Sequence, residues 1–324
     1  MSRPLFLAIA LLTAAMASLF AALLSGTFPI SVPQLFDGIF SPAPGVAHDV
    51  IWQLRVPRAL AAFACGGLLA LSGVLLQVLL RNALADPYIL GVSSGASLGA
   101  LTALTLGAGA VLMNTAALIG AIAAIVIVFG LSFRRGDWNA YRVLLTGVVL
   151  SSGLSALISL TLVMAPQGQV KGMLFWLMGD LSYAGDPLVA WLILAVLTTL
   201  GITQATRLDL LGLGELKAQA LGVAVTPLQL GIFFSAALAT VAAVLLGGAI
   251  GFVGLLIPHA IRLLGVANHR ALLPLAVLLG GAFLTLADTL ARTLLAPQQL
   301  PVGVLTALLG VPAMLVLLGA CRRT

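Results

Sequence analysis

Charged residues are scarce in this 324-residue sequence. They make up 7% of it, against 61% hydrophobic residues, and the mean hydropathy is +1.20. A soluble domain carries about 25% charged residues. A surface with so little charge does not stay monomeric in water, so most of the chain is expected to lie in hydrocarbon. The composition excludes an ordinary soluble enzyme or binding module.

Cysteine and histidine are also rare. Cys65 and Cys321 are too few and too far apart for a disulfide framework or for metal-ligand spacing. The three histidines, His48, His259 and His269, are scattered along the chain. No metal or haem site is therefore predicted within this chain.

Several catalytic motifs are missing as well. The sequence has no G-x-x-x-x-G-K-[ST] phosphate loop, H-E-x-x-H or G-x-S-x-G. Without a phosphate loop the chain does not hydrolyse nucleotide itself, so it is predicted to be a transporter subunit, not an enzyme. An ion-coupled carrier usually needs ionisable groups near the bilayer midplane. Only Asp288 lies inside an apolar run, close to its end. A secondary transporter of a large organic solute therefore remains the less favoured alternative.

Long apolar runs dominate the sequence. A helical span needs about 20 residues, and the runs do not alternate as strands of a membrane barrel would. We predict an all-α, polytopic membrane protein with one permease domain over residues 1–324. The ten predicted spans are 5–25, 56–80, 91–110, 113–133, 142–165, 187–206, 227–247, a short half-span at 250–263, 271–292 and 302–320.

Basic residues predict the orientation. With a cytoplasmic N-terminus and ten crossings, only four of the 15 Lys and Arg residues lie outside: Arg55, Arg58, Lys171 and Arg292. The anionic lipid surface and the membrane potential favour this bias. Both termini are predicted to be cytoplasmic. The net charge of +6 is explained by this topology, so no nucleic-acid partner is invoked.

The longest inside segment, 207–227, is amphipathic. Leu213, Leu216, Ala220 and Leu221 recur at helical spacing between polar residues. Two short helices are expected, broken at 212–214 and at Gly222. The apolar stripe either contacts another protein or lies on lipid headgroups.

Several segments in one collinear order resemble the FecCD family of ATP-binding-cassette (ABC) importer permeases. The resemblance covers nearly the whole chain. It rests on Arg55-Val-Pro-Arg58, Gly73 to Gln77, Arg81-Asn82 with Asp86-Pro87 and Gly91-Val-Ser-Ser-Gly95, Phe175-Trp176-Leu-Met-Gly179, Gly214-Glu215 with Leu221-Gly222, Gly251-Phe-Val-Gly254 through Pro258-His259 to Arg262, Asp288 to Arg292, Leu300-Pro301-Val-Gly303 and Leu309-Gly310-Val-Pro312. Ala83 departs from the family loop, which usually has Pro there.

The resemblance implies a type II ABC importer permease fold in a bacterial inner membrane. The implied partners are a second permease subunit, two ABC ATPase subunits inside and a periplasmic substrate-binding protein outside. A homodimer is expected, although a heterodimer is left open. ATP and magnesium would bind the ATPase, and this chain would hold no cofactor. The implied cargo is a metal chelate: an iron-siderophore or haem first, cobalamin next.

The resemblance also assigns roles to residues. It places the inside segment on the ATPase as the coupling element, through Leu213, Gly214, Glu215, Lys217, Ala218, Leu221 and Gly222. It matches Arg55, Arg58 and Arg292 to outer arginines that dock the binding protein. These three also breach the charge bias, and arginine holds a carboxylate bidentately. Snorkelling to lipid headgroups is the alternative.

The loop after the second span and one face of the fifth are candidates for the gate and pathway. The loop residues are Arg81, Asn82, Asp86 and Pro87, with Ser93 or Ser94 expected to cap the next helix. A plain structural turn is an equal alternative. Ser151, Ser155 and Ser159 recur every four residues, which suits a helix-packing seam or a pathway lining.

Overall fold

The computed structural model describes residues 3–40, 45–133, 139–182 and 184–321. Described residues form helices and connecting turns, without strands. The helices are α1 (Arg3–Leu24), α2 (Val32–Phe40), α3 (Val46–Asp49), the π-helix η1 (Val50–Arg55), α4 (Val56–Leu79), the 3₁₀ helix η2 (Pro87–Leu90), α5 (Val92–Thr105), α6 (Ala110–Ser132), α7 (Ala140–Met164), α8 (Gln167–Leu177), α9 (Leu188–Thr203), α10 (Ala205–Gly212), α11 (Glu215–Ala220), α12 (Val225–Gly247), α13 (Val253–Leu263), α14 (His269–Thr293) and α15 (Val302–Cys321).

Each of the ten predicted spans coincides with a helix. In the described part of the chain, six helices are long and apolar enough to cross a membrane alone, namely α1, the continuous α3–η1–α4 segment, α6, α7, α12 and α14. α9 and α10 form a further candidate span that bends by 66° between them. α5, α13 and α15 account for the remaining three predicted runs.

Two predicted boundaries were wrong. α5 has 14 residues and stops at Thr105, whereas a full span was expected. The segment after α7 was taken as an outside loop, but it contains the 11-residue helix α8. The short run before Arg262 is a half-span as expected. α13 has 11 residues, which is about 16 Å of helix and half of a bilayer core of about 30 Å.

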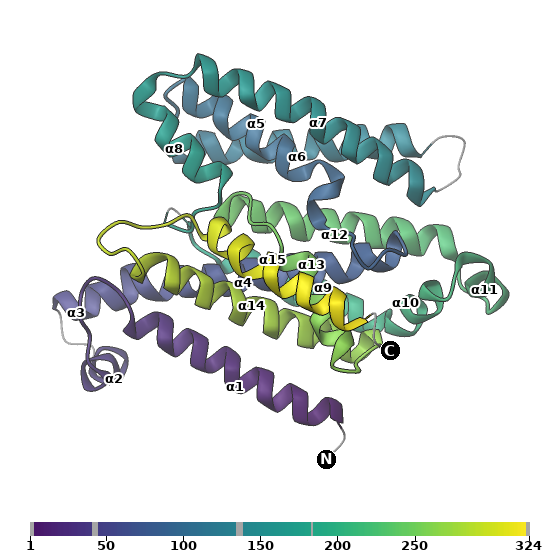
Figure 1. The fold of residues 1–324 in the computed structure, drawn as a ribbon, viewed down its shortest axis with the longest axis horizontal. Helices are drawn as coiled ribbons and strands as arrows, with labels where there is room; N and C mark the ends of the chain where they lie inside the picture. Colours follow the sequence, from purple (N-terminus) through teal and green to yellow (C-terminus); the bar gives the residue numbers. More distant parts are fainter. Residues whose placement is uncertain (1–2, 41–44, 134–138, 183, 322–324) are drawn as a thin grey trace.

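α4 is the centre of the molecule (Figure 1), with α12, α13, α14 and α9 packed around it. Glycines allow this close approach, because a side chain at Gly73 would strike the Gly254 carbonyl of α13, and one at Gly66 would strike the Gly280 carbonyl of α14. Association of membrane helices depends on such small residues, since lipid gives no hydrophobic drive.

The other helices are arranged around this centre. α5, α6, α7 and α8 lie together at the top of the view in Figure 1. α11, the N-terminus and the C-terminus lie at one end of the molecule, here called the α11 end. α2, α3 and α8 lie at the opposite end, here called the α2 end (Figure 1). The candidate sites fall at these two ends.

Candidate functional site

The predicted amphipathic segment folds into two short helices, as expected. α10 ends at Gly212, and α11 runs from Glu215 to Ala220. Gly214 and Gly222 flank α11 with φ of +113° and +82°. Residues with a side chain rarely adopt these values, so the two glycines set where α11 begins and ends.

Three leucines on α11 and beside it point away from the protein. Ala218 is fully buried against the rest of the chain. Leu213, Leu216 and Leu221 are 60%, 83% and 61% exposed. Lys217 and Gln219 are exposed beside them. We call the three leucines the coupling patch. Because apolar side chains gathered at this exposure favour a covering partner, the patch is a candidate contact surface.

A polar chain connects α11 to the core helices. Glu215 of α11 accepts a hydrogen bond from Arg81, at the end of α4, over 3.1 Å. One helical turn earlier in α4, Gln77 accepts from Arg262 of α13 and donates to the Leu255 carbonyl at 3.4 Å. Side-chain hydrogen bonds therefore join the coupling segment to α4, and α4 to α13.

The predicted gate loop follows α4 and packs against the start of α13 and the turn before it. Asn82 accepts a hydrogen bond from the Leu84 amide at 2.9 Å. Pro87 lies against Gly254, where any side chain would strike its ring. The Tyr88 hydroxyl donates to the Ile250 carbonyl at 2.8 Å and accepts from the Ile250 amide at 2.6 Å. The loop thus contacts the break between α12 and α13. A displacement of either helix would therefore move the loop.

The cap of this loop differs from the one predicted. Asp86 begins η2 and accepts from the Tyr88 amide at 2.9 Å. Burial raises the pKa of the Asp86 carboxyl group to about 6, against the opposing effect of that hydrogen bond. α5 begins after Gly91 (φ +72°) and has no side-chain cap, so the expectation that Ser93 or Ser94 caps it was wrong. The turn at Gly91 already ends η2, which leaves both serines inside α5.

The serine face of α7 divides into two parts. Gly147 packs so closely on η2 that a side chain would meet the Ile89 carbonyl, and Ser151 lies beside Gly91. This part is a packing seam. Ser155 and Ser159 are exposed further along the helix. Their place in a pathway stays a prediction.

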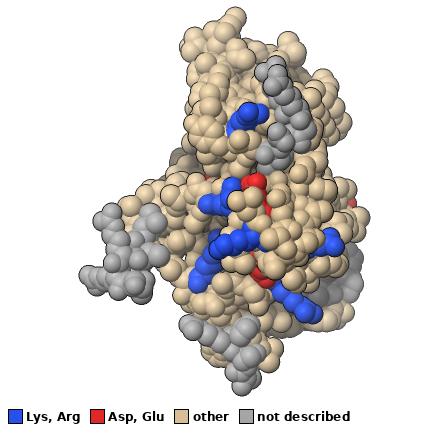
Figure 2. Space-filling model, turned by 90° about the vertical axis from the view of Figure 1, so that its right-hand side faces the viewer, with Lys and Arg blue, Asp and Glu red and all other residues tan. Residues whose placement is uncertain are grey.

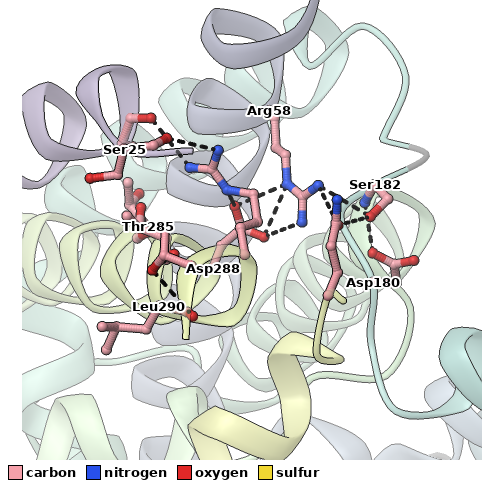
Figure 3. A network of polar contacts seen from close by, with 12 residues as sticks. Ser25, Arg58, Asp180, Ser182, Thr285, Asp288 and Leu290 are labelled. Carbon is pink, nitrogen blue, oxygen red and sulfur yellow. Dashed lines mark hydrogen bonds and ion pairs between the residues drawn. The ribbon is translucent and has the colours of Figure 1, made fainter. Parts of the chain in front are cut away.

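At the α2 end, one carboxylate holds two arginines (Figure 3). Asp288 is 1% exposed. Its oxygens lie 2.8 Å from the Arg58 guanidinium and 3.2 Å from that of Arg292. Arg58 also reaches Ser182 and Gln299, both at 3.1 Å. We call Arg58, Asp288 and Arg292 the arginine cluster. Two cations share one anion, so the cluster keeps a positive charge near the surface.

Arg55 and Arg292 also cap the end of α1. Arg55 donates to the carbonyls of Leu23, Leu24 and Phe28. Arg292 donates to those of Ala22 and Ser25 at 3.3 and 3.4 Å. The last carbonyls of a helix lack internal partners and carry partial negative charge, so arginine suits this position. Of the three arginines, only Arg58 donates to exposed side chains, those of Ser182 and Gln299. The docking role of all three stays a prediction, and this geometry favours Arg58 for it.

A cavity of about 700 Å³ opens next to the arginine cluster. Phe175, Trp176 and Lys171 line it from α8 and its neighbourhood, with Asp180 and Ser182 on the side toward Arg58. Over the described residues, no group of three His, Cys, Asp or Glu is placed to hold a metal ion. The cavity can therefore receive a bulky, partly apolar molecule but offers no ready metal ligands.

The chain is similar to known transporters over most of its length. The sequence profile of the FecCD transport family matches residues 12–320. The chain belongs to the FecCD transport family. Three curated relatives are similar to it over most of their lengths. The molybdate import permease MolB of Haemophilus influenzae is 35% identical, over 92% of this chain and 90% of MolB. The vitamin B12 permease BtuC of Escherichia coli is 38% identical, over 84% of each chain. The hemin permease HmuU of Yersinia pestis is 40% identical, over 82% of this chain and 83% of HmuU.

A solved structure confirms the fold of this FecCD family member. It is described as an inward-facing conformation of a metal-chelate type ABC transporter. The TM-score is 0.84 at 32% identity, over 97% of this chain and 99% of the other. The chain thus has the type II ABC importer permease fold and is a multi-pass transporter component. The three relatives are named for different cargoes, so family membership leaves the cargo open.

Proposed function

We propose that this chain is the permease subunit of an ABC importer that moves a metal chelate from periplasm to cytoplasm. An iron-siderophore or haem is the first candidate cargo and cobalamin the second. In this proposal the chain pairs with a second permease subunit, two ATPase subunits and a periplasmic binding protein. ATP and magnesium act on the ATPase, and the permease needs no cofactor of its own.

The exposed coupling patch is the observation that carries this proposal. It lies at the end where both termini lie, and Lys and Arg side chains gather on that face (Figure 2). Basic residues favour the cytoplasmic side. An apolar patch projecting there suits contact with an ATPase subunit. When that subunit moves α11, the salt bridge between Arg81 and Glu215 would transmit the movement to α4.

The opposite end then faces the periplasm. Arg58 presents a positive, hydrogen-bonding edge there, which suits a carboxylate on a binding protein. The cavity beside it is lined by two aromatic rings and Lys171, which supports entry of a bulky chelate with acidic groups. Because the permeases of metal-chelate importers accept cargo from the binding protein, selectivity is assigned mainly to that partner.

Reconstitution tests the proposal. The permease, its ATPase and its binding protein are placed in proteoliposomes and offered a ferric siderophore, haem and cobalamin in parallel. We expect uptake of one chelate that requires ATP on the α11 side. Uptake driven by a proton or sodium gradient without the ATPase would favour the secondary-transporter alternative and overturn the proposal.

The coupling patch is tested by Leu216→Glu. Leu216 is 83% exposed and forms no part of the core, so the change should leave folding intact while the ATPase no longer co-purifies and uptake is lost. Leu106→Glu is a matched control, because Leu106 is 81% exposed in the turn after α5. Equal ATPase recovery with both variants would contradict the assignment.

Docking is tested by supplying Arg58 with a carboxylate from within the chain. Gln299 already lies 3.1 Å from Arg58 and is exposed, so Gln299→Glu should occupy this guanidinium edge and weaken binding-protein capture. Gln298→Glu adds the same charge at the next exposed position. A pull-down with purified binding protein measures both, and equal weakening would point to general charge repulsion instead.

A further inference from the structure

A second cavity lies at the α11 end, next to the coupling segment, and Gly222 is part of its lining. It is a groove of about 420 Å³ between α9 and α12. Its floor is Leu75 of α4, and buried Leu197, Leu208 and Ile232 line its walls. Gly231 leaves its rim open. We call this the α9–α12 groove. Its volume lies within the range of about 300–1,000 Å³ that is usual for ligand sites.

Arg207, in the first turn of α10 just after the bend from α9, lines the groove. The helix axis turns by 66° there. α10 buries Ala205, Leu208 and Leu211 and leaves Arg207 exposed. Arg207 donates to Gln204 at 2.9 Å, and both residues line the groove. A bend that lays a short amphipathic helix across the end of a span is the geometry of a membrane interface.

Arg207 has no acidic partner among the described residues. The carboxylate nearest in sequence, Asp209, is occupied by His269. Lys and Arg predominate on the face at this end (Figure 2). The guanidinium of Arg207 is therefore available to bind an anion from outside the chain.

The groove itself opens to hydrocarbon. Leu192, Val196 and Leu200 are 58%, 57% and 52% exposed and follow one face of α9 down to the groove. In a chain that spans the membrane, such a stripe is covered by lipid tails. A single amphipathic molecule could thus place its apolar part in the groove and its anionic group beside Arg207.

We propose that the α9–α12 groove is a binding site for an anionic phospholipid. The acyl chains lie in the groove, and the phosphate accepts hydrogen bonds from the guanidinium of Arg207 and the amide of Gln204. Arginine binds phosphate through paired N–H donors, and basic pockets between spans on the cytoplasmic side suit anionic headgroups. The site lies at the base of α10, so an occupying lipid steadies the segment that leads to the coupling patch.

Native mass spectrometry of the purified transporter tests this site. The detergent-solubilised complex is titrated with dioleoyl phosphatidylglycerol and, separately, with dioleoyl phosphatidylcholine. We expect one phosphatidylglycerol per permease chain to bind more tightly than the zwitterionic lipid. Arg207→Gln should weaken that binding by about five- to tenfold, the size of one basic contact at a membrane surface. Inorganic phosphate should not displace the lipid, because it has no chains to fill the groove.

A second variant fills the groove and leaves the arginine in place. Nothing lies within 4 Å of a Cβ built at Gly231, which lines the groove, so Gly231→Leu should fold and exclude the acyl chains. Gly130→Leu is the matched control on α6, where the surroundings are equally open. Arg270→Gln controls for charge, since Arg270 is exposed at the same end outside the groove.

The outcomes separate clearly. Weaker phosphatidylglycerol binding in Arg207→Gln and Gly231→Leu, with both controls unchanged, supports the site. Equal binding of the two lipids to the parent complex would overturn it, as would an equal loss in Arg270→Gln. Loss of the ATPase from Arg207→Gln with lipid binding unchanged would assign Arg207 to the protein interface instead.

Discussion

Asp288 is a buried carboxylate that contacts two arginines. It was the one acidic residue expected inside a span, and an ion-coupling role was disfavoured for it. The structure places it against Arg58 and Arg292, so its charge is already compensated. Both carboxylate oxygens are engaged by arginines, so Asp288 is not a free site for a coupling ion. This geometry supports a positioning role at the α2 end.

Asp288→Asn should therefore destabilise the protein. The change leaves two largely buried guanidinium groups without a counter-charge, and breaking a buried ion pair from one side costs about 3–5 kcal/mol. Thermal unfolding of the purified permease in detergent measures the loss. Asp37→Asn is the control, since Asp37 is exposed on α2 and pairs with no cation among the described residues. Equal midpoints for the two variants would contradict the role assigned to Asp288.

The sequence marked the unusual arginines but not their partners. Arg55 and Arg292 stood out because they breach the inside bias of basic residues. Their guanidinium groups contact the carbonyls at the end of α1. These contacts depend on how α1, α4 and α14 pack, and a local sequence pattern does not predict that packing. Residue types were thus predictable, while contacts between distant segments were not.

At the scale of elements, hydrophobic runs predicted where helices form but not how far each extends. Ten runs became ten helices because lipid leaves a backbone no other way to satisfy its hydrogen bonds. α5 and α13 are short because each lies between glycines with positive φ, Gly91 and Gly107 around α5, Gly248 and Gly265 around α13. α8 escaped prediction because 11 residues with a lysine look like a loop. Resemblance to the family supplied the rest of the architecture.

Close helix packing yields a prediction at this scale. A methyl group at Gly73 would lie 2.0 Å from the Gly254 oxygen. α4 and α13 must then separate, and overpacking a tight core costs about 1–3 kcal/mol or more. Gly73→Ala should lower the unfolding midpoint and the amount of inserted protein.

Gly153→Ala provides the matched comparison. Gly153 is an exposed helical glycine with nothing within 4 Å of an added methyl group. Replacing it should be neutral or slightly stabilising, because alanine favours a helix by about 1 kcal/mol over glycine. Similar behaviour of the two variants, followed by fluorescence-detected gel filtration during heating, would show that the contact between α4 and α13 is not tight.

In the whole molecule, one helix connects the two candidate sites. α4 begins next to the docking candidate Arg58 and ends next to Gln77 and Arg81. Its 24 residues make a rod of about 36 Å. Most of its length is buried against four other helices, so a tilt at the coupling patch moves the arginine cluster as well. A rigid central helix of this kind suits a transporter whose two faces must open in turn.

The orientation of this rod is the last prediction. The basic face at the α11 end (Figure 2) should lie in the cytoplasm, although Arg134, Arg135, Arg322 and Arg323, which also support it, fall outside the described residues. Single cysteines at exposed Gln219 on α11 and Gln167 on α8, in a Cys321→Ser background, report the two faces. Cys65 is fully buried and should stay silent. With a membrane-impermeant maleimide, Gln167→Cys should label in cells with a permeabilised outer membrane. Gln219→Cys should label only after the inner membrane is opened. The reverse order would place the coupling patch outside, where no ATPase could reach it.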